Sequence, residues 1–120
     1  MQVLIVYTQS PDDSAQCGAP FLYAQDAVAR GCDVEIFFTT RGTALLKKGV
    51  AETVFPKLGG KSIRQFIDET VAKGVRLVVC APSLELNGMT EDDLIDEADN
   101  LVGTAYLIKK GLEADLVLTF

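Results

Sequence analysis

The chain has 120 residues, of which 17 are Asp or Glu and 11 are Lys or Arg, so its formal charge at pH 7 is -6. This acidic balance, without a cluster of basic residues, argues against nucleic acid and anionic membrane surfaces as partners. The chain has no histidine, which excludes Ser-His-Asp and Cys-His catalytic groups and any zinc site that uses histidine. At this length we expect one domain over residues 1–120.

The first half of the chain predicts alternating strands and helices. Pro20 suits the first turn of a helix, and the Arg30-Gly31 pair suits its end. The expected elements, in order, are a strand at residues 3–8, a helix at 20–30, a strand at 34–39, a short helix at 43–48 and a short strand at 52–55.

The second half continues the alternation. Ser62 and Gln65 form the sequence pattern of a capping box, and Thr90 with Asp93 three residues later indicates a second helix start. After Thr90, apolar residues recur at helical spacing as far as Ile108. The expected elements are a helix at 63–73, a strand at 75–81, a long helix at 91–110 and a strand at 116–120.

The predicted strands are continuously apolar rather than alternating, which is typical of parallel strands covered by helices on both faces. We therefore predict an α/β fold, a three-layer α/β/α sandwich with a mostly parallel sheet of four to five strands. Ligands of such sheets bind beyond the carboxyl ends of the strands. Any chemistry is expected just after Thr8, Thr39 and Val79.

Two further patterns are interpreted structurally. Residues 59–62 (GGKS) resemble the last residues of a phosphate-binding loop. The full motif also needs a glycine five positions before Gly60, and this chain has Phe55 there. The acidic residues within 91–99 are interpreted as the solvated start of a helix, because a divalent metal needs oxygens that converge on one point. We therefore expect neither a metal nor a cofactor.

Cys80 is the candidate catalytic residue because it ends a predicted strand at the edge where parallel sheets bind ligands. Pro82 and Ser83 begin a predicted helical turn, and the amides of Ser83 and Leu84 are expected to favour a thiolate over a thiol. The alternative is a small buried side chain that only packs, since free cysteine is among the most buried residue types. The residues alone leave both interpretations open.

The three cysteines are widely spaced and form no C-x-x-C pair, which indicates free thiols in a reducing, cytoplasmic setting. Cys17 is a candidate resolving thiol at the rim that holds Cys80, with an ordinary loop cysteine as the alternative. Cys32 opens a strand at the opposite edge and is expected only to pack. The other candidate pocket residues, chosen for their position near strand ends, are Thr8, Ser10, Ser83 and Asn87.

Several segments together resemble the DsrE/DsrF-like proteins. Residues 18–24 (GAPFLYA) and 34–42 (VEIFFTTRG) have the character of that family's first helix and second strand. Cys80, a few residues ahead of residues 87–89 (NGM), is similar to the family's strand-end cysteine, and residues 113–120 (EADLVLTF) resemble its C-terminal strand. The similarity spans nearly the whole chain in the same order.

The resemblance implies a small cytoplasmic α/β protein that assembles into homotrimers or homohexamers. It also implies a sulfur carrier of sulfurtransferase type, which holds a persulfide on Cys80 between a donor protein and an acceptor thiol. The alternative function is a non-catalytic oligomeric binding or assembly module in which Cys80 is structural.

Overall fold

The sheet of the computed structural model, which describes residues 1–120, has five strands. Every neighbouring pair of strands is parallel, and the order across the sheet is β4-β3-β2-β1-β5. The strands are β1 (Gln2–Tyr7), β2 (Asp33–Phe38), β3 (Arg76–Cys80), β4 (Ala98–Val102) and β5 (Leu116–Thr119). The predicted α/β class with a parallel sheet is confirmed.

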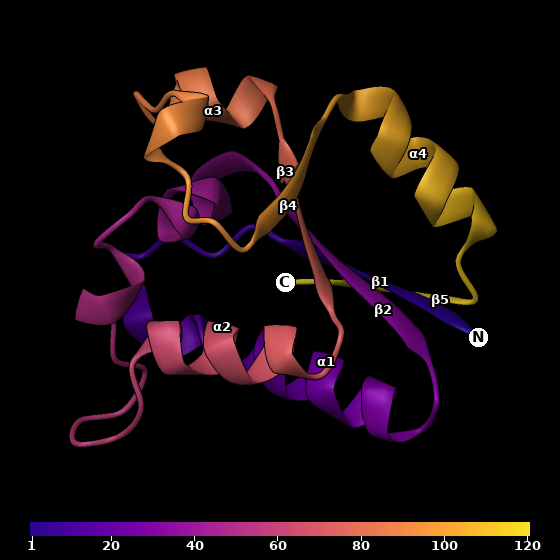
Figure 1. Cartoon of the computed structure of the whole chain (residues 1–120), viewed down its shortest axis with the longest axis horizontal. Coiled ribbons are helices and arrows are strands. Elements are labelled where there is room, and N and C mark those ends of the chain that lie inside the picture. Colours follow the sequence, from indigo (N-terminus) through magenta and orange to yellow (C-terminus); the bar gives the residue numbers. More distant parts are fainter.

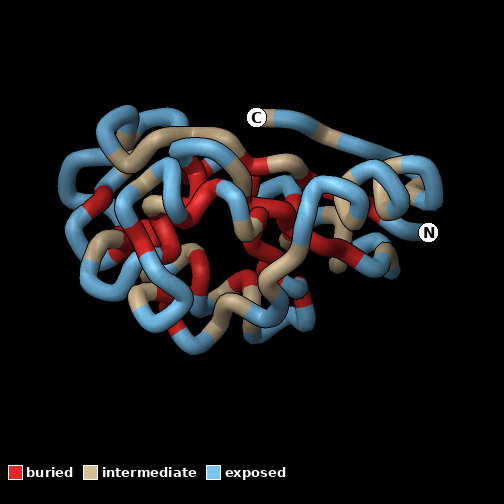
Figure 2. Tube along the Cα trace, turned by 90° about the horizontal axis from the view of Figure 1, so that it is seen from above, coloured by how far each residue is buried: buried red, intermediate tan, exposed pale blue.

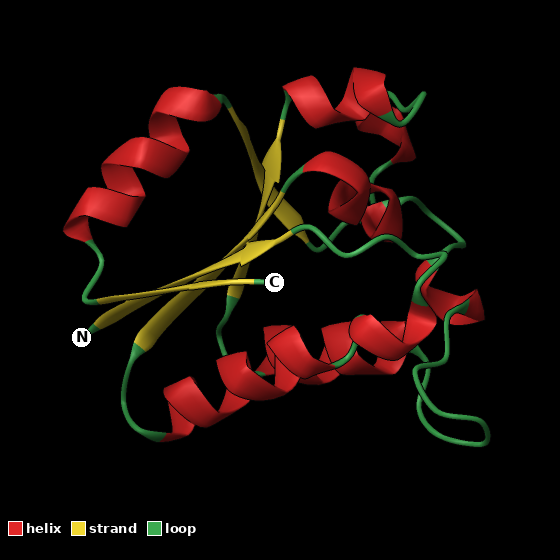
Figure 3. Cartoon of the chain, turned by 180° about the vertical axis from the view of Figure 1, so that it is seen from behind, coloured by secondary structure: helices red, strands yellow, loops and turns green.

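Helices cover both faces of this sheet and form the outer two layers (Figure 1). The helices are α1 (Ala19–Ala29), α2 (Ile63–Ala72), α3 (Pro82–Leu86) and α4 (Thr104–Glu113). Helices α1 and α2 lie side by side on one face, whereas α4 lies on the other and α3 follows the carboxyl end of β3 (Figures 1 and 3). No helix has both the length and the apolar character needed to cross a lipid bilayer.

The local signals for α1 and α2 act as expected. The hydroxyl oxygen of Ser62 accepts a hydrogen bond from the Gln65 amide, and the Gln65 side chain accepts one from the Ser62 amide. Two backbone N–H groups at the start of α2 are thereby satisfied. Pro20 lies in the first turn of α1, and Gly31, with a φ of 87°, follows its end.

The two faces of the sheet are buried to different extents. A cluster of 22 buried residues fills the side that faces α1 and α2, with Phe21, Phe38 and Ile67 among its members. The side under α4 holds a smaller cluster of four buried apolar residues, Leu4, Phe37, Val78 and Cys80. Figure 2 shows the buried positions concentrated along the inner strands and the C-terminal segment left exposed or half-buried.

The prediction of a long helix at residues 91–110 is wrong. Thr90 and Asp93 do form a capping box, but the helix that they start is a single 3-10 turn, Glu91–Asp93. The chain then becomes β4, which pairs with β3, and α4 begins only after Gly103. Pairing with the open edge of β3 overrides the local helical pattern of residues 98–102, a tertiary effect that a periodicity analysis does not see.

Two shorter elements also differ from the prediction. The strand expected at residues 52–55 is instead a 3-10 turn, Ala51–Thr53, closed by the Thr53 hydroxyl donating to the Val50 carbonyl at 2.7 Å. The short helix expected at 43–48 is a 3-10 helix, Thr40–Leu46, that begins directly after β2. Residues 52–55 pair with none of the five strands of the sheet.

Candidate functional site

A strained turn follows β2 at the carboxyl edge of the sheet. Thr40 has a φ of 50°, which a β-branched residue rarely adopts because its side chain crowds the backbone. The Thr40 amide donates to the hydroxyl oxygen of Ser83 at 2.8 Å, and the Asn87 side-chain amide donates to the Thr40 carbonyl at 2.8 Å. Two side chains from α3 and its C-cap therefore hold the backbone of this turn in place.

A chain of polar contacts extends from this turn across the rim. The Arg41 guanidinium donates to the side-chain oxygen of Asn87 at 2.6 Å and lies 3.4 Å from a carboxylate oxygen of Asp12. The same Asp12 oxygen accepts from the Ser10 hydroxyl at 3.4 Å. The structure thus brings together three of the predicted pocket residues, Ser10, Ser83 and Asn87.

Cys80 lies on a different side of the same edge. It is the last residue of β3, it is 5% exposed, and it packs with Leu4, Phe37 and Val78 under α4. No hydrogen bond reaches its sulfur, and the Leu84 amide, one of the two expected to face the thiol, donates instead to the Ala81 carbonyl at 3.1 Å. The thiol of the isolated chain is therefore covered by side chains and is not held by neighbouring amides.

Cys17 is buried on the opposite side, in the main core. Its thiol donates to the Ser10 carbonyl at 3.3 Å, and its own carbonyl accepts a hydrogen bond from the Tyr7 hydroxyl at 2.8 Å. Burial raises the pKa of the Cys17 thiol and also raises that of the Tyr7 phenol. Cys17 thus ties the connection between β1 and α1 to itself and to the end of β1, and it shares no surface cleft with Cys80.

The remaining sequence-derived candidates lie apart from this network. The Thr8 amide donates to the Phe120 carbonyl at 2.8 Å, so Thr8 ties the C-terminus to the end of β1. Cys32 is half-buried and precedes β2, at the amino edge of the sheet. All three cysteines are free thiols.

Two features of this part of the molecule were not predicted from the sequence. Arg41 follows Thr39, one of the predicted strand ends, but nothing in the sequence shows that its guanidinium reaches Asn87. Glu35 is a lone carboxylate inside an apolar strand, and it is 4% exposed. A single acid in such a strand signals a buried partner, and the parallel register pairs Glu35 with Arg76 of β3.

The fold and the thiol together define a class, a small parallel α/β/α protein with a cysteine at the carboxyl end of an interior strand. Residues 1–120 match the DsrE/DsrF-like family, so the chain belongs to that family. The resemblance noted in the sequence is therefore confirmed over the whole chain.

Relatives and solved structures are similar to this chain over nearly its whole length. The chain is 26% identical to the uncharacterized protein MJ0989 of Methanocaldococcus jannaschii, over the full length of both chains. It is similar in structure to the ychN protein of E. coli, with a TM-score of 0.81 and 21% identity, covering 100% of this chain and 99% of the other. It is also similar to MTH1491 of Methanobacterium thermoautotrophicum, a protein of unknown function, with a TM-score of 0.77, 17% identity and coverages of 99% and 98%. At these identities the structural likeness establishes the fold alone.

Proposed function

We propose that the protein is a sulfur carrier, which holds a sulfane sulfur on Cys80 as a persulfide and passes it to an acceptor thiol. The observation that carries the proposal is the position of Cys80, at the carboxyl end of an interior parallel strand and on the more thinly covered face. Cys17 is sealed in the main core, and Cys32 lies at the opposite edge. Membership of the DsrE/DsrF-like family supports the proposal, since the sequence resemblance implies sulfur relay. A reducing cytoplasmic setting keeps the thiol free for this role.

The proposed transfer needs no metal, oxidant or reductant. In loading, the Cys80 thiolate attacks the outer sulfur of a donor persulfide, the bond between the two donor sulfurs breaks, and the donor leaves as a thiolate. In unloading, the acceptor thiolate attacks the same outer sulfur, and Cys80 leaves as a thiolate. The proton that Cys80 gives up on ionisation passes to solvent, so atoms and electrons balance in both steps.

Intact-mass measurement after incubation with a small persulfide donor tests this proposal. We expect the wild-type protein to gain the mass of one sulfur atom and to lose it again on reduction. The Cys80→Ser variant should gain none, whereas Cys32→Ser, which removes a half-buried thiol at the other edge, should load like the wild type. No added sulfur on the wild type, or equal addition to Cys80→Ser, would contradict the proposal.

A specific observation favours a second function, an oligomeric assembly module in which Cys80 only packs. Exposed apolar residues of α4 and β5 form one surface, which we call the α4–β5 surface; they are Ile108, Leu112 and Val117. A groove of about 290 Å³, lined almost entirely by apolar side chains, lies on this surface between α4 and the sheet. The adjoining edge of β5 has no strand partner, and an unpaired apolar edge favours association.

Light scattering of the purified protein tests assembly through this surface. We expect the wild type to form a homotrimer or homohexamer, and Leu112→Glu to dissociate it, because the charge would lie in a buried apolar contact. Leu58→Glu is the matched control, since Leu58 is fully exposed in a loop away from α4 and β5. A monomeric wild type, or an unchanged mass for Leu112→Glu, would count against the α4–β5 surface.

A further inference from the structure

Helix α4 lies over the face of the sheet that holds Cys80, and few of its residues are anchored there. None of its ten residues is fully buried, although Tyr106 and Leu107 pack against the four-residue cluster that contains Cys80. The other long helices, α1 and α2, each have three buried residues, two of which belong to the main core. The cover over the thiol is thus the least deeply packed long helix of the molecule.

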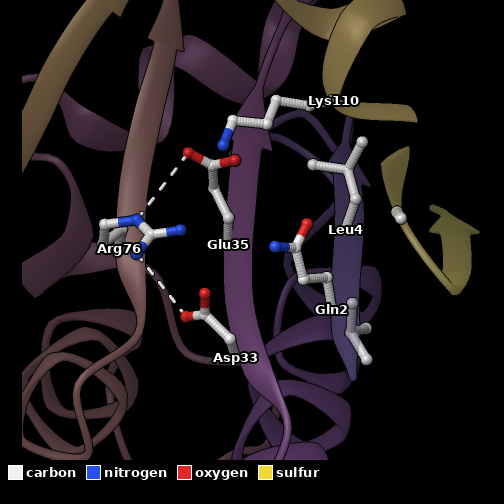
Figure 4. A pocket seen from close by; sticks show the side chains of 8 residues that line it. Gln2, Leu4, Asp33, Glu35, Arg76 and Lys110 are labelled. Atoms are coloured by element: carbon white, nitrogen blue, oxygen red, sulfur yellow. Dashed lines mark hydrogen bonds and ion pairs between the residues drawn. The ribbon is translucent and has the colours of Figure 1, made fainter. Parts of the chain in front are cut away.

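A buried polar cluster lies on the same face, closer to the amino ends of the strands. The Glu35 carboxylate lies 3.9 Å from the Arg76 guanidinium, which also contacts Asp33 at 3.5 Å. Figure 4 shows Arg76 between these two carboxylates, with the Lys110 amine of α4 pointing toward Glu35. The cavity here is about 10 Å³, room for about one water molecule, so the cluster is not a ligand pocket.

Tyr106 connects this cluster to the cover over the thiol. Its hydroxyl donates to the Glu35 carboxylate, and this is the only side-chain hydrogen bond between α4 and the sheet. Burial, together with the hydrogen bond to Glu35, raises the pKa of Tyr106 to about 12. The phenol therefore keeps its proton and remains a donor throughout the physiological range. Its ring also packs on the cluster that holds Cys80.

We propose that Tyr106 is a positioning residue that fastens α4 over Cys80, so that breaking its hydrogen bond to Glu35 opens the path to the thiol. This inference rests on the proposed function, because it describes how a carrier cysteine with only 5% exposure is kept covered and then reached. A buried carboxylate that has lost a hydrogen-bond donor is stabilised when it reaches water. Lifting α4 from the sheet admits water to Glu35 and solvent to Cys80 at the same time.

Alkylation of the native protein, with each cysteine followed separately by peptide mass mapping, tests the inference. Tyr106→Phe should raise the alkylation rate of Cys80 at least about ten-fold, since hydrogen bonds to charged groups contribute enough to change an opening equilibrium by that factor. Glu35→Gln retains an acceptor for the phenol but loses the charge, so the rate should rise less than in Tyr106→Phe. Tyr23→Phe is the matched control, because Tyr23 is exposed on α1 and makes no side-chain hydrogen bond.

Cys17 separates opening of α4 from general unfolding, because it lies in the main core. Its alkylation rate should not change in Tyr106→Phe, and hydrogen exchange should quicken in α4 but not in β3. An unchanged rate at Cys80, a parallel rise at Cys17, or an equal rise at Cys80 in Glu35→Gln would overturn the inference.

These measurements distinguish this inference from the sulfur-carrier proposal. If Tyr106→Phe exposes Cys80 to alkylation but neither it nor the wild type takes sulfur from a persulfide donor, the fastening by Tyr106 stands and the carrier function fails. If the wild type loads sulfur on Cys80 while Tyr106→Phe leaves the alkylation rate unchanged, the carrier function stands and the fastening fails.

Discussion

Replacing Phe38 with alanine should lower the free energy of unfolding by about 3–5 kcal/mol, the range measured for deleting a fully buried ring. Phe38 ends β2 and is completely buried. Its ring centroid lies 4.7 Å from that of Tyr7 in β1 and 6.3 Å from that of Phe21 in α1. The substitution therefore leaves a cavity where two strands and a helix meet, and surrounding atoms in a parallel sheet have little freedom to fill it.

Urea unfolding followed by circular dichroism measures this change. Phe38→Leu should cost less than Phe38→Ala, because leucine refills part of the volume. Leu58→Ala is the control: the side chain is fully exposed, so its removal should change stability by less than about 0.5 kcal/mol. A cost below about 1 kcal/mol for Phe38→Ala would show that the three rings do not form a close-packed contact.

The sequence determines the inner part of the fold because the strongest local signals and the tertiary contacts agree there. The apolar runs that become β1, β2 and β3 are buried on both faces, so their composition alone identifies them. The capping box of α2 is equally local, since Ser62 and Gln65 satisfy each other without help from the rest of the chain. These elements could be predicted in their order along the chain and with their parallel direction, whereas the order of the strands across the sheet could not.

The edge of the sheet could not be predicted in the same way. Residues 98–102 are half-buried or exposed, and their strand exists only because β3 offers unpaired backbone groups beside them. A helical stripe continues through them as far as Ile108, so the local pattern and the tertiary pairing disagree, and the pairing prevails. Such a disagreement between levels is expected at the margin of a fold rather than at its centre.

The same difference limits what the sequence reveals of the candidate site. The position of Cys80 at a strand end follows from local signals, and α3 begins at Pro82 as predicted. The position of α4 over the face that holds Cys80 does not follow from local signals. A helix that began at residue 91 would not place Tyr106 on this face. The contact of Tyr106 with Glu35 depends on the break at Gly103 and on the register of a parallel sheet, which no local pattern encodes.

Replacing Gly42 with alanine should destabilise the protein by about 3 kcal/mol, the upper part of the range for overpacking a buried position. A Cβ atom at Gly42 would lie 2.5 Å from the Tyr7 carbonyl oxygen and 2.9 Å from the Tyr7 ring. The first of these atoms is backbone, and it already accepts the Thr39 amide at 3.0 Å, so it cannot move without disturbing the end of β1. The added methyl group must instead push residues 40–42 away from the sheet.

That displacement should distort the strained turn at Thr40 as well as lower the stability of the whole chain. Thr40 keeps its φ of 50° because Ser83 and Asn87 bind its amide and its carbonyl, and an outward shift lengthens both hydrogen bonds. Hydrogen exchange should therefore quicken at the Thr40 amide by more than the loss in global stability explains. Gly111→Ala is the matched control, since its Cβ would meet only Leu4 at 4.0 Å and alanine favours a helix by about 1 kcal/mol. Equal stability for the two variants would mean that the backbone at Gly42 moves to accommodate the methyl group. The close approach of residues 40–42 to β1 would then not determine the conformation of this rim.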